Sequence, residues 1–216
     1  MTTALLQTTY FGPVQWYQKL HRYDHCLIEQ YDSFSKQTYR NRCVIATANG
    51  VQALTVPVIS LNPQPSSLNP QPSSLHTLTK DIRISDHNQW RRVHWNALQS
   101  AYSESPFFEY YADDLHPFFE TRYEFLLDFN EAIRQKICEL TDIHPDIEYT
   151  TGFMPTHADL PVADFREVIS AKHPQPDDGF EVKPYWQVFR HRHGFLPNLS
   201  ILDLLFNMGP ESIFYL

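Results

Sequence analysis

The chain is poor in glycine and has no glycine-rich motif. Its 216 residues include six glycines, at positions 12, 50, 152, 179, 194 and 209. These are too scattered to form the loop that holds a dinucleotide or a phosphate group. The Gly-x-Ser-x-Gly turn that presents a hydrolase nucleophile is also missing. The sequence therefore argues against Rossmann and P-loop enzymes.

Cysteine is equally scarce. The chain has three cysteines, Cys26, Cys43 and Cys138. An odd number at such wide spacing suits neither a disulfide framework nor a zinc knuckle. We predict that the three side chains are reduced thiols in the core.

Metal-binding motifs are missing as well. His21 and His25 are four residues apart and would share one helix face, but no glutamate lies between them in a metalloprotease pattern and no third ligand is evident. His191 and His193 form a second close pair. Because the chain has 11 histidines, such pairs arise by chance. We predict no metal site, and the sequence assigns no cofactor.

Long apolar runs and excess positive charge are also lacking. No segment approaches the roughly 18 apolar residues of a membrane span, and the first seven residues lack the basic start of a signal peptide. We therefore expect a cytoplasmic protein. The formal net charge is −8 and the pI is about 5.7, which argues against nucleic acid as a partner.

The apolar content is sufficient for one sizeable core, since 42% of the residues are hydrophobic and 14% are aromatic. We predict a single α/β domain over residues 1–216, with a small mixed sheet, flanking helices and a buried C-terminal helix. The residues between 141 and 183 are expected to form loops with a little strand. Periodicity and turn signals predict these elements: strands over 3–8 and 26–30, a hairpin of 42–47 and 51–58 with a type I′ turn at Asn49-Gly50, and helices over 13–20, from 88 to before Pro106, and over 117–140.

Residues 60–75 contain a tandem duplication. The sequence Leu-Asn-Pro-Gln-Pro-Ser-Ser occurs at 61–67 and again at 68–74. Four prolines exclude a helix or a central strand here, and two seven-residue copies are too short for a repeat fold. We interpret the segment as a surface loop lengthened by duplication.

The C-terminal region carries the clearest helix signals. Ser200 followed by Asp203 resembles a capping box, and Gly209-Pro210 is a stop signal. The residues between them are almost all apolar. They predict a short helix that is packed into the core.

Three polar residues in these elements each allow two interpretations. His94 lies on the same helix face as Trp90 and Ala101, so it points inward, as a satisfied core residue or as a general base. Arg42, at the start of the hairpin, either holds a phosphate or carboxylate or pairs with a surface carboxylate. Asp203 either complements the helix dipole or takes part in chemistry.

Four segments together resemble the motifs of the WbqC-like proteins, a bacterial family linked to surface-polysaccharide synthesis. The resemblance is strongest at the C-terminus, and Thr9 replaces the proline that is usual in the first motif. The segments are Gln7 to Pro13, Asn41-Arg42 with the strand that follows, Trp90-x-x-x-His94 with Tyr102 and Pro106-Phe107-Phe108, and Tyr185 to Pro210.

The resemblance implies roles for these residues. His94 would be the base, Arg42 the anion clamp, and Asp203 with Asn207 the orienting groups, and we expect His94, Arg42 and Asp203 to converge on one pocket. Asn207 is a polar residue in an apolar helix and needs a buried partner or a ligand. The other expected substrate-binding residues are Tyr10, Asn41, Tyr102, Tyr185 and Gln187.

The resemblance also implies a function. It points to a cytoplasmic enzyme that modifies an activated sugar or an amino-group substrate during cell-surface glycan synthesis, with acyl or aminoacyl transfer as the candidate reaction. The substrate would be a small molecule or a nucleotide sugar. The competing interpretation is a noncatalytic binding or assembly protein, in which the same polar residues are structural.

Overall fold

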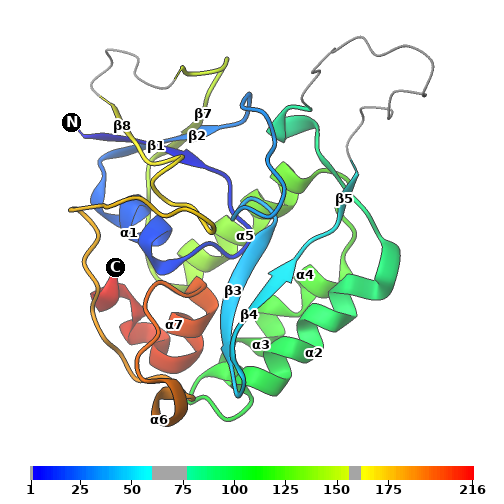
Figure 1. Cartoon of the computed structure of the whole chain (residues 1–216), viewed down its shortest axis with the longest axis vertical. Helices are drawn as coiled ribbons and strands as arrows, with labels where there is room; N and C mark the ends of the chain where they lie inside the picture. Colours follow the sequence, from blue (N-terminus) through cyan, green and yellow to red (C-terminus); the bar gives the residue numbers. More distant parts are fainter. Residues whose placement is uncertain (1, 60–76, 156–161) are drawn as a thin grey trace.

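The computed structural model describes residues 2–59, 77–155 and 162–216. Its central feature is a four-stranded parallel sheet in the order β7-β2-β1-β8 (Figure 1). The strands are β1 (Thr3–Gln7), β2 (His25–Glu29), β7 (Ile147–Tyr149) and β8 (Val162–Asp164). The α/β class is confirmed. The duplicated loop at 60–75 lies outside the described residues.

The order of the strands reverses at β1. From β1 the chain passes through helix α1 (Val14–Arg22) to β2, and β7 pairs with the far side of β2. Strand β8 instead pairs with the opposite side of β1. The carboxyl ends of parallel strands meet at one edge of the sheet, and a crevice forms there at the point where the strand order reverses. This edge is where ligands bind in open α/β sheets.

The hairpin is confirmed, but its predicted turn type is wrong. Strands β3 (Arg42–Thr47) and β4 (Gly50–Thr55) pair antiparallel in a ribbon separate from the main sheet, with Thr47 opposite Gly50. A type I′ turn requires positive φ at both central residues. Here those residues are Ala48 and Asn49, neither of which has positive φ, and Gly50 at φ 109° takes the unusual conformation instead. A second short ribbon joins β5 (Val58–Ile59) to β6 (Arg83–Ile84).

The helical region contains more breaks than its periodicity predicted. Helices α2 (Trp90–Tyr102) and α3 (Phe108–Leu115) precede α4 (Pro117–Glu120) and α5 (Leu126–Leu140), so the single helix expected over 117–140 is interrupted. At the break, the Ile84 amide donates to the Glu124 carbonyl and the Leu126 amide donates to the Ile82 carbonyl. Pairing with β6 therefore overrides the local helical pattern.

The C-terminal helix is buried, as predicted. In α7 (Ile201–Met208) every residue from Ile201 to Asn207 is buried, and the helix joins the same hydrophobic cluster as the sheet and helices α2 to α5. The Ser200 hydroxyl accepts a bond from the Leu202 amide, which forms only half of a capping box, because the Asp203 carboxylate turns inward. Gly209, at φ 57°, ends the helix. Short helical turns complete the fold: η1 (Thr79–Asp81), η2 (His87–Gln89), α6 (Arg190–His193) and η3 (Gly209–Tyr215).

The three cysteines are buried free thiols, which confirms that prediction. Burial raises the pKa of the Cys26 thiol to about 12 and that of Cys138 to about 11. These thiols are therefore protonated and unreactive at neutral pH. Within the described parts of the chain, no helix is both long enough and apolar enough to cross a bilayer.

Candidate functional site

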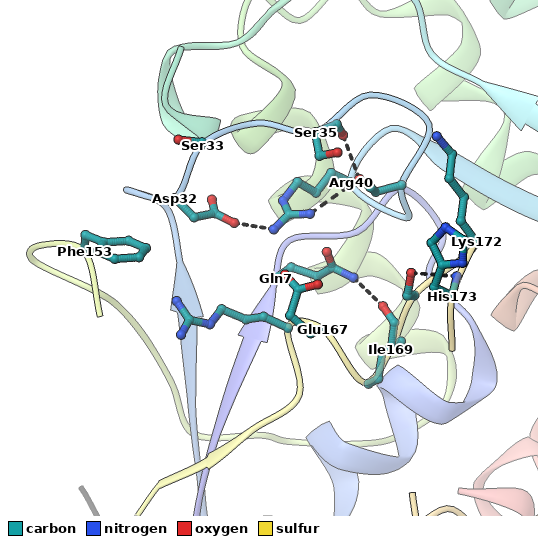
Figure 2. Close-up of a pocket in the computed structure, with 13 residues that line it drawn as sticks. Gln7, Asp32, Ser33, Ser35, Arg40, Phe153, Glu167, Ile169, Lys172 and His173 are labelled. Carbon is teal, nitrogen blue, oxygen red and sulfur yellow. Dashed lines mark hydrogen bonds and ion pairs between the residues drawn. The ribbon is translucent and has the colours of Figure 1, made fainter. Parts of the chain in front are cut away.

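A cavity of about 370 Å³ opens at the carboxyl edge of the parallel sheet, where β1 and β8 end (Figure 2). Gln7 is the last residue of β1, and the segment that follows β8 supplies one wall. Loops after β2 supply the opposite wall. The lining residues are Gln7, Asp32, Ser33, Ser35, Thr38, Arg40, Phe153, Arg166, Glu167, Ile169, Ser170, Lys172 and His173.

Gln7 closes the floor of the cavity. Its side-chain amide donates to the Ile169 carbonyl at 2.7 Å, and both residues are buried. This bond ties the segment after β8 to the end of the central strand. A polar residue at the end of a buried strand thus positions a wall of the cavity.

A buried ion-pair network supports one side. Arg166 donates to Glu29 at 3.2 Å, to both oxygens of Asp164, and to the Met154 carbonyl at 2.7 Å. Glu29, which is fully buried, also accepts bonds from the Met154 and Tyr31 amides. Breaking such a network by removing one partner leaves an uncompensated buried charge. The geometry of Arg166 is therefore strongly fixed.

A second buried pair supports the other side. The Arg40 guanidinium is paired with Asp32, which also accepts a bond from the Thr79 hydroxyl. The Arg40 carbonyl accepts a bond from the Asn130 side chain at 2.8 Å. Among the described residues, nothing pairs with the Arg40 Nε atom, although the side chain is only 7% exposed. A buried donor of this kind calls for a ligand or a water molecule.

The rim of the cavity carries free charges of both signs. Glu167, Lys172 and His173 are exposed, and their side chains form no hydrogen bond or ion pair with any other described residue. Lys172 can receive an anionic group, while Glu167 can accept bonds from hydroxyl or amino groups. Arg40 and Arg166 are already paired with carboxylates, which leaves Lys172 and Glu167 to bind a ligand. The cavity therefore suits a ligand that carries both an anionic group and hydroxyl or amino groups.

His94 lies elsewhere, at a smaller cavity of about 300 Å³ beside helix α2. Its Nδ1 atom is 2.9 Å from the Tyr10 hydroxyl, and the Thr55 backbone also bonds the ring. Burial lowers the pKa of His94 to about 4, and the Thr55 bond opposes this shift. The imidazole is inward, as predicted, and neutral at pH 7. Tyr10 is fully buried and does not line the carboxyl-edge cavity.

We expect this histidine to make folding sensitive to acid. Its folded pKa of about 4 is below the ordinary value of about 6.5, so the unfolded chain binds more protons between these values. Stability from His94 is complete above pH 6.5 and falls by about 3 kcal/mol as the pH drops to 4. Urea unfolding at pH 7 and 4.5 should show a smaller acid loss in His94→Gln. The exposed control His191→Gln should behave like the parent, and an unchanged loss in His94→Gln would contradict the burial argument.

Arg42, the expected anion clamp, and Asn41, an expected substrate-binding residue, have structural partners close to His94. The Arg42 Nε donates to the Thr55 hydroxyl across the hairpin at 3.2 Å, and the Asn41 side chain donates to the Val56 carbonyl at 2.9 Å. Thr55 therefore connects Arg42 to His94 through its side chain and its backbone. Neither Arg42 nor Asn41 lines a cavity that we describe among residues 2–59, 77–155 and 162–216.

Asp203 is the centre of a third cluster. Its carboxylate accepts bonds from the Tyr102 hydroxyl at 2.8 Å, the Tyr185 hydroxyl at 2.7 Å and the Gln187 amide at 2.9 Å. Asn207 donates to the Asp203 carbonyl at 2.7 Å. Burial raises the pKa of Asp203, and the four side-chain donors, Tyr185, Tyr102, Gln187 and Asn207, oppose that shift. Five of the predicted site residues therefore lie together, but in a closed and buried network: Tyr102, Tyr185, Gln187, Asp203 and Asn207.

His94, Arg42 and Asp203 therefore do not share one cavity in the described part of the chain. Their internal partners favour the structural interpretation of each, while their assignment to catalysis stays a prediction. Sequence patterns did not predict the residues of the carboxyl-edge cavity, above all Arg40 and Arg166. The available signal was the polar residue that directly follows each apolar strand, because parallel strands gather such residues at one edge.

Comparison with known proteins places the cavity within a recognised family region. The family model of the WbqC-like protein family matches residues 7–173. The chain is also 27% identical to the uncharacterized protein Rv1507c of Mycobacterium tuberculosis over 234 residues, which covers 99% of this chain and 96% of that protein. No solved structure matches. The matched region begins at Gln7 and ends at His173, so it includes every residue that lines the cavity but excludes Asp203.

Proposed function

The chain belongs to the WbqC-like protein family, and we propose that it is a cytoplasmic enzyme that binds an activated sugar in the carboxyl-edge cavity during cell-surface glycan synthesis. The substrate would be a nucleotide sugar or a related compound with an amino group. Acyl or aminoacyl transfer to that group is the proposed reaction. The glycan setting rests on the motif resemblance, and the binding site rests on the cavity.

One observation carries the proposed binding site: the cavity lies where the strand order reverses, and it is lined by fixed arginines and free polar groups. Ion pairs hold Arg40 and Arg166 in place before any ligand arrives, which reduces the entropy lost on binding. Lys172 can take an anionic group and Glu167 can take sugar hydroxyls. Cavities of about 300 to 1,000 Å³ commonly hold small molecules.

The second candidate function is noncatalytic binding of the same class of ligand. It is favoured by a specific observation: the expected base and orienting groups, His94 and Asp203, already have internal hydrogen-bond partners. In that case the ligand would bind without being changed. The two functions differ in whether the bound sugar gains an acyl group when a donor is present.

We expect nucleotide sugars to raise the melting temperature of the protein and Ser35→Trp to abolish that rise. Ser35 is exposed and lines the cavity, so an indole there would fill the space that the ligand needs. Ser103→Trp is the matched control, because Ser103 is exposed at the end of α2 and does not line the cavity. Thermal-shift titration checks this, and a rise that survives in Ser35→Trp would rule out the cavity as the binding site.

Mass spectrometry of the same mixtures separates the two functions. With an acyl or aminoacyl donor added, an enzyme should transfer the acyl group to the amino group of the sugar and release the donor's leaving group with the displaced proton. The mass of the sugar should then rise by that of the acyl group less one hydrogen, and Ser35→Trp should give no such rise. Binding without any mass change across the donor panel would support the noncatalytic function.

A further inference from the structure

We propose that the cavity takes a nucleotide whose base stacks on Phe153 and whose phosphate lies toward Lys172. This inference rests on the proposed function and adds which part of the substrate binds where. It follows from the two unlike ends of the cavity. Figure 2 shows Phe153 at one side, Lys172 and His173 at the opposite side, and Gln7 with Arg40 between them.

Phe153 is an exposed aromatic ring on an anchored backbone. The side chain is 55% exposed and lines the cavity. The next residue, Met154, is held on both sides, because its amide donates to Glu29 at 2.9 Å and its carbonyl accepts from Arg166 at 2.7 Å. Thr150, three residues earlier, bonds the Ile28 carbonyl and the Glu29 carboxylate. The ring is therefore presented to the cavity by a fixed loop.

This arrangement suits a stacking platform. A fully exposed ring on a mobile loop would lose entropy when a ligand orders it, whereas an anchored ring loses little. The Arg166 guanidinium lies 5.8 Å from the centre of the Phe153 ring, so the platform is joined to the same ion-pair network that supports the cavity. Bases stack on aromatic side chains with little dependence on sequence, because every base has a planar face.

The opposite end suits a phosphate group. Lys172 is exposed and has no other described partner, and His173 lies next to it. Arg40 lines the cavity between the two ends, where its ion pair with Asp32 holds the side chain in place. Glu167 lies in the middle of the view in Figure 2, where it can accept bonds from ribose or sugar hydroxyls. The order ring, hydroxyls, anion is that of a nucleotide.

Binding measurements on the full-length protein test this assignment. The probes are UDP, GDP and ADP, with uridine, glucose 1-phosphate and inorganic phosphate as partial ligands. We expect Phe153→Ala to weaken binding of at least one nucleoside diphosphate about tenfold or more, since stacking of one base commonly has an effect of that size. Binding of inorganic phosphate should not change, and Phe153→Trp should restore nucleotide binding.

Lys172→Ala should weaken nucleotides and inorganic phosphate by a similar factor and reduce the salt dependence of both. Trp186→Ala and Arg92→Ala are the matched controls, because each removes an exposed aromatic or cationic side chain that does not line the cavity. Both controls should bind as the parent does.

Two results would overturn the inference, and they differ in what they mean for the proposed function. If glucose 1-phosphate binds as tightly as the nucleotides and Phe153→Ala changes neither, the base does not stack on Phe153, while the cavity remains the site of an activated sugar. If no nucleotide or sugar phosphate binds the parent protein, both the inference and the proposed function fail.

Discussion

A chain that ends at Pro197 is expected to lose its cooperative unfolding transition. The truncation removes α7, in which Ile201, Leu202, Leu204, Leu205 and Phe206 are all fully buried. Each such side chain contributes about 1.5 to 3 kcal/mol when buried, against a total stability of about 5 to 15 kcal/mol for a typical domain. The burial free energy lost with these five side chains is therefore comparable with the whole free energy of folding.

The truncation also removes backbone pairing that joins distant segments. The Ile201 amide donates to the Gly12 carbonyl, and the Ser200 amide donates to the Val44 carbonyl. The start of the helix thus links the loop after β1 to the hairpin, and the truncation would remove the partners of both carbonyls. We therefore expect the loss of cooperative unfolding to result from lost tertiary packing as much as from the loss of the helix itself.

Circular dichroism during urea unfolding is the direct measurement. The truncated chain should show no sigmoidal transition, whereas Phe214→Ala, which shortens a side chain that is 71% exposed, should unfold like the parent. Leu205→Ala should give an intermediate loss of about 2 to 5 kcal/mol. A soluble truncated chain with a sharp transition would show that α7 is dispensable for the core.

Local sequence signals were sufficient for the elements that depend on local patterns. The strands at 3–8 and 26–30 and the helices after residues 13 and 88 differ from the observed elements by one or two residues at most ends. The apolar run between Ser200 and Gly209 predicted α7, because a short, nearly all-apolar segment with start and stop signals can be stable only inside a core. A helix that is apolar on nearly all sides has no charged face to present to water, so it must be buried.

The sequence could not predict the break between α4 and α5. The apolar spacing continues through residues 121–125, but the backbone of Glu124 and Leu126 bonds to Ile84 and Ile82, which lie about 40 positions earlier in the chain. A periodic pattern reports which residues are apolar, and it does not report which backbone groups a distant strand will use. The same reason explains why β7 and β8 were expected only as loop with a little strand.

The prediction of Arg42, and not Arg40, as the residue that binds an anion has a similar cause. The two arginines are only two positions apart, and Arg42 begins a strand that local signals identify. Arg40 lines the cavity because its ion pair with Asp32 holds it in the interior, and Asp32 is in turn fixed by a bond from the Thr79 hydroxyl. These contacts are visible only in three dimensions. A buried arginine needs a carboxylate partner, and sequence distance does not reveal which carboxylate will be near.

Asp203→Ala is expected to destabilise the protein by about 2 to 6 kcal/mol, because each buried donor left unsatisfied costs about 1 to 3 kcal/mol. The change removes the acceptor of the Tyr102 and Tyr185 hydroxyl groups. The Gln187 amide keeps a second partner, the Leu196 carbonyl, so its loss should be smaller. Asp203→Asn retains one acceptor oxygen and should fall between the parent and the alanine variant.

This result separates the structural interpretation of Asp203 from the catalytic one. Residues that serve chemistry are commonly not optimised for stability, so removing a catalytic carboxylate should leave the fold nearly unchanged while activity disappears. The matched control is Asp178→Ala, because Asp178 is an exposed aspartate that does not line the cavity. Urea unfolding should show a large loss for Asp203→Ala and almost none for Asp178→Ala. If Asp203→Ala instead keeps its stability within about 1 kcal/mol and loses only ligand-dependent stabilisation, Asp203 belongs to the functional site, since such a small change is typical of residues without a structural role.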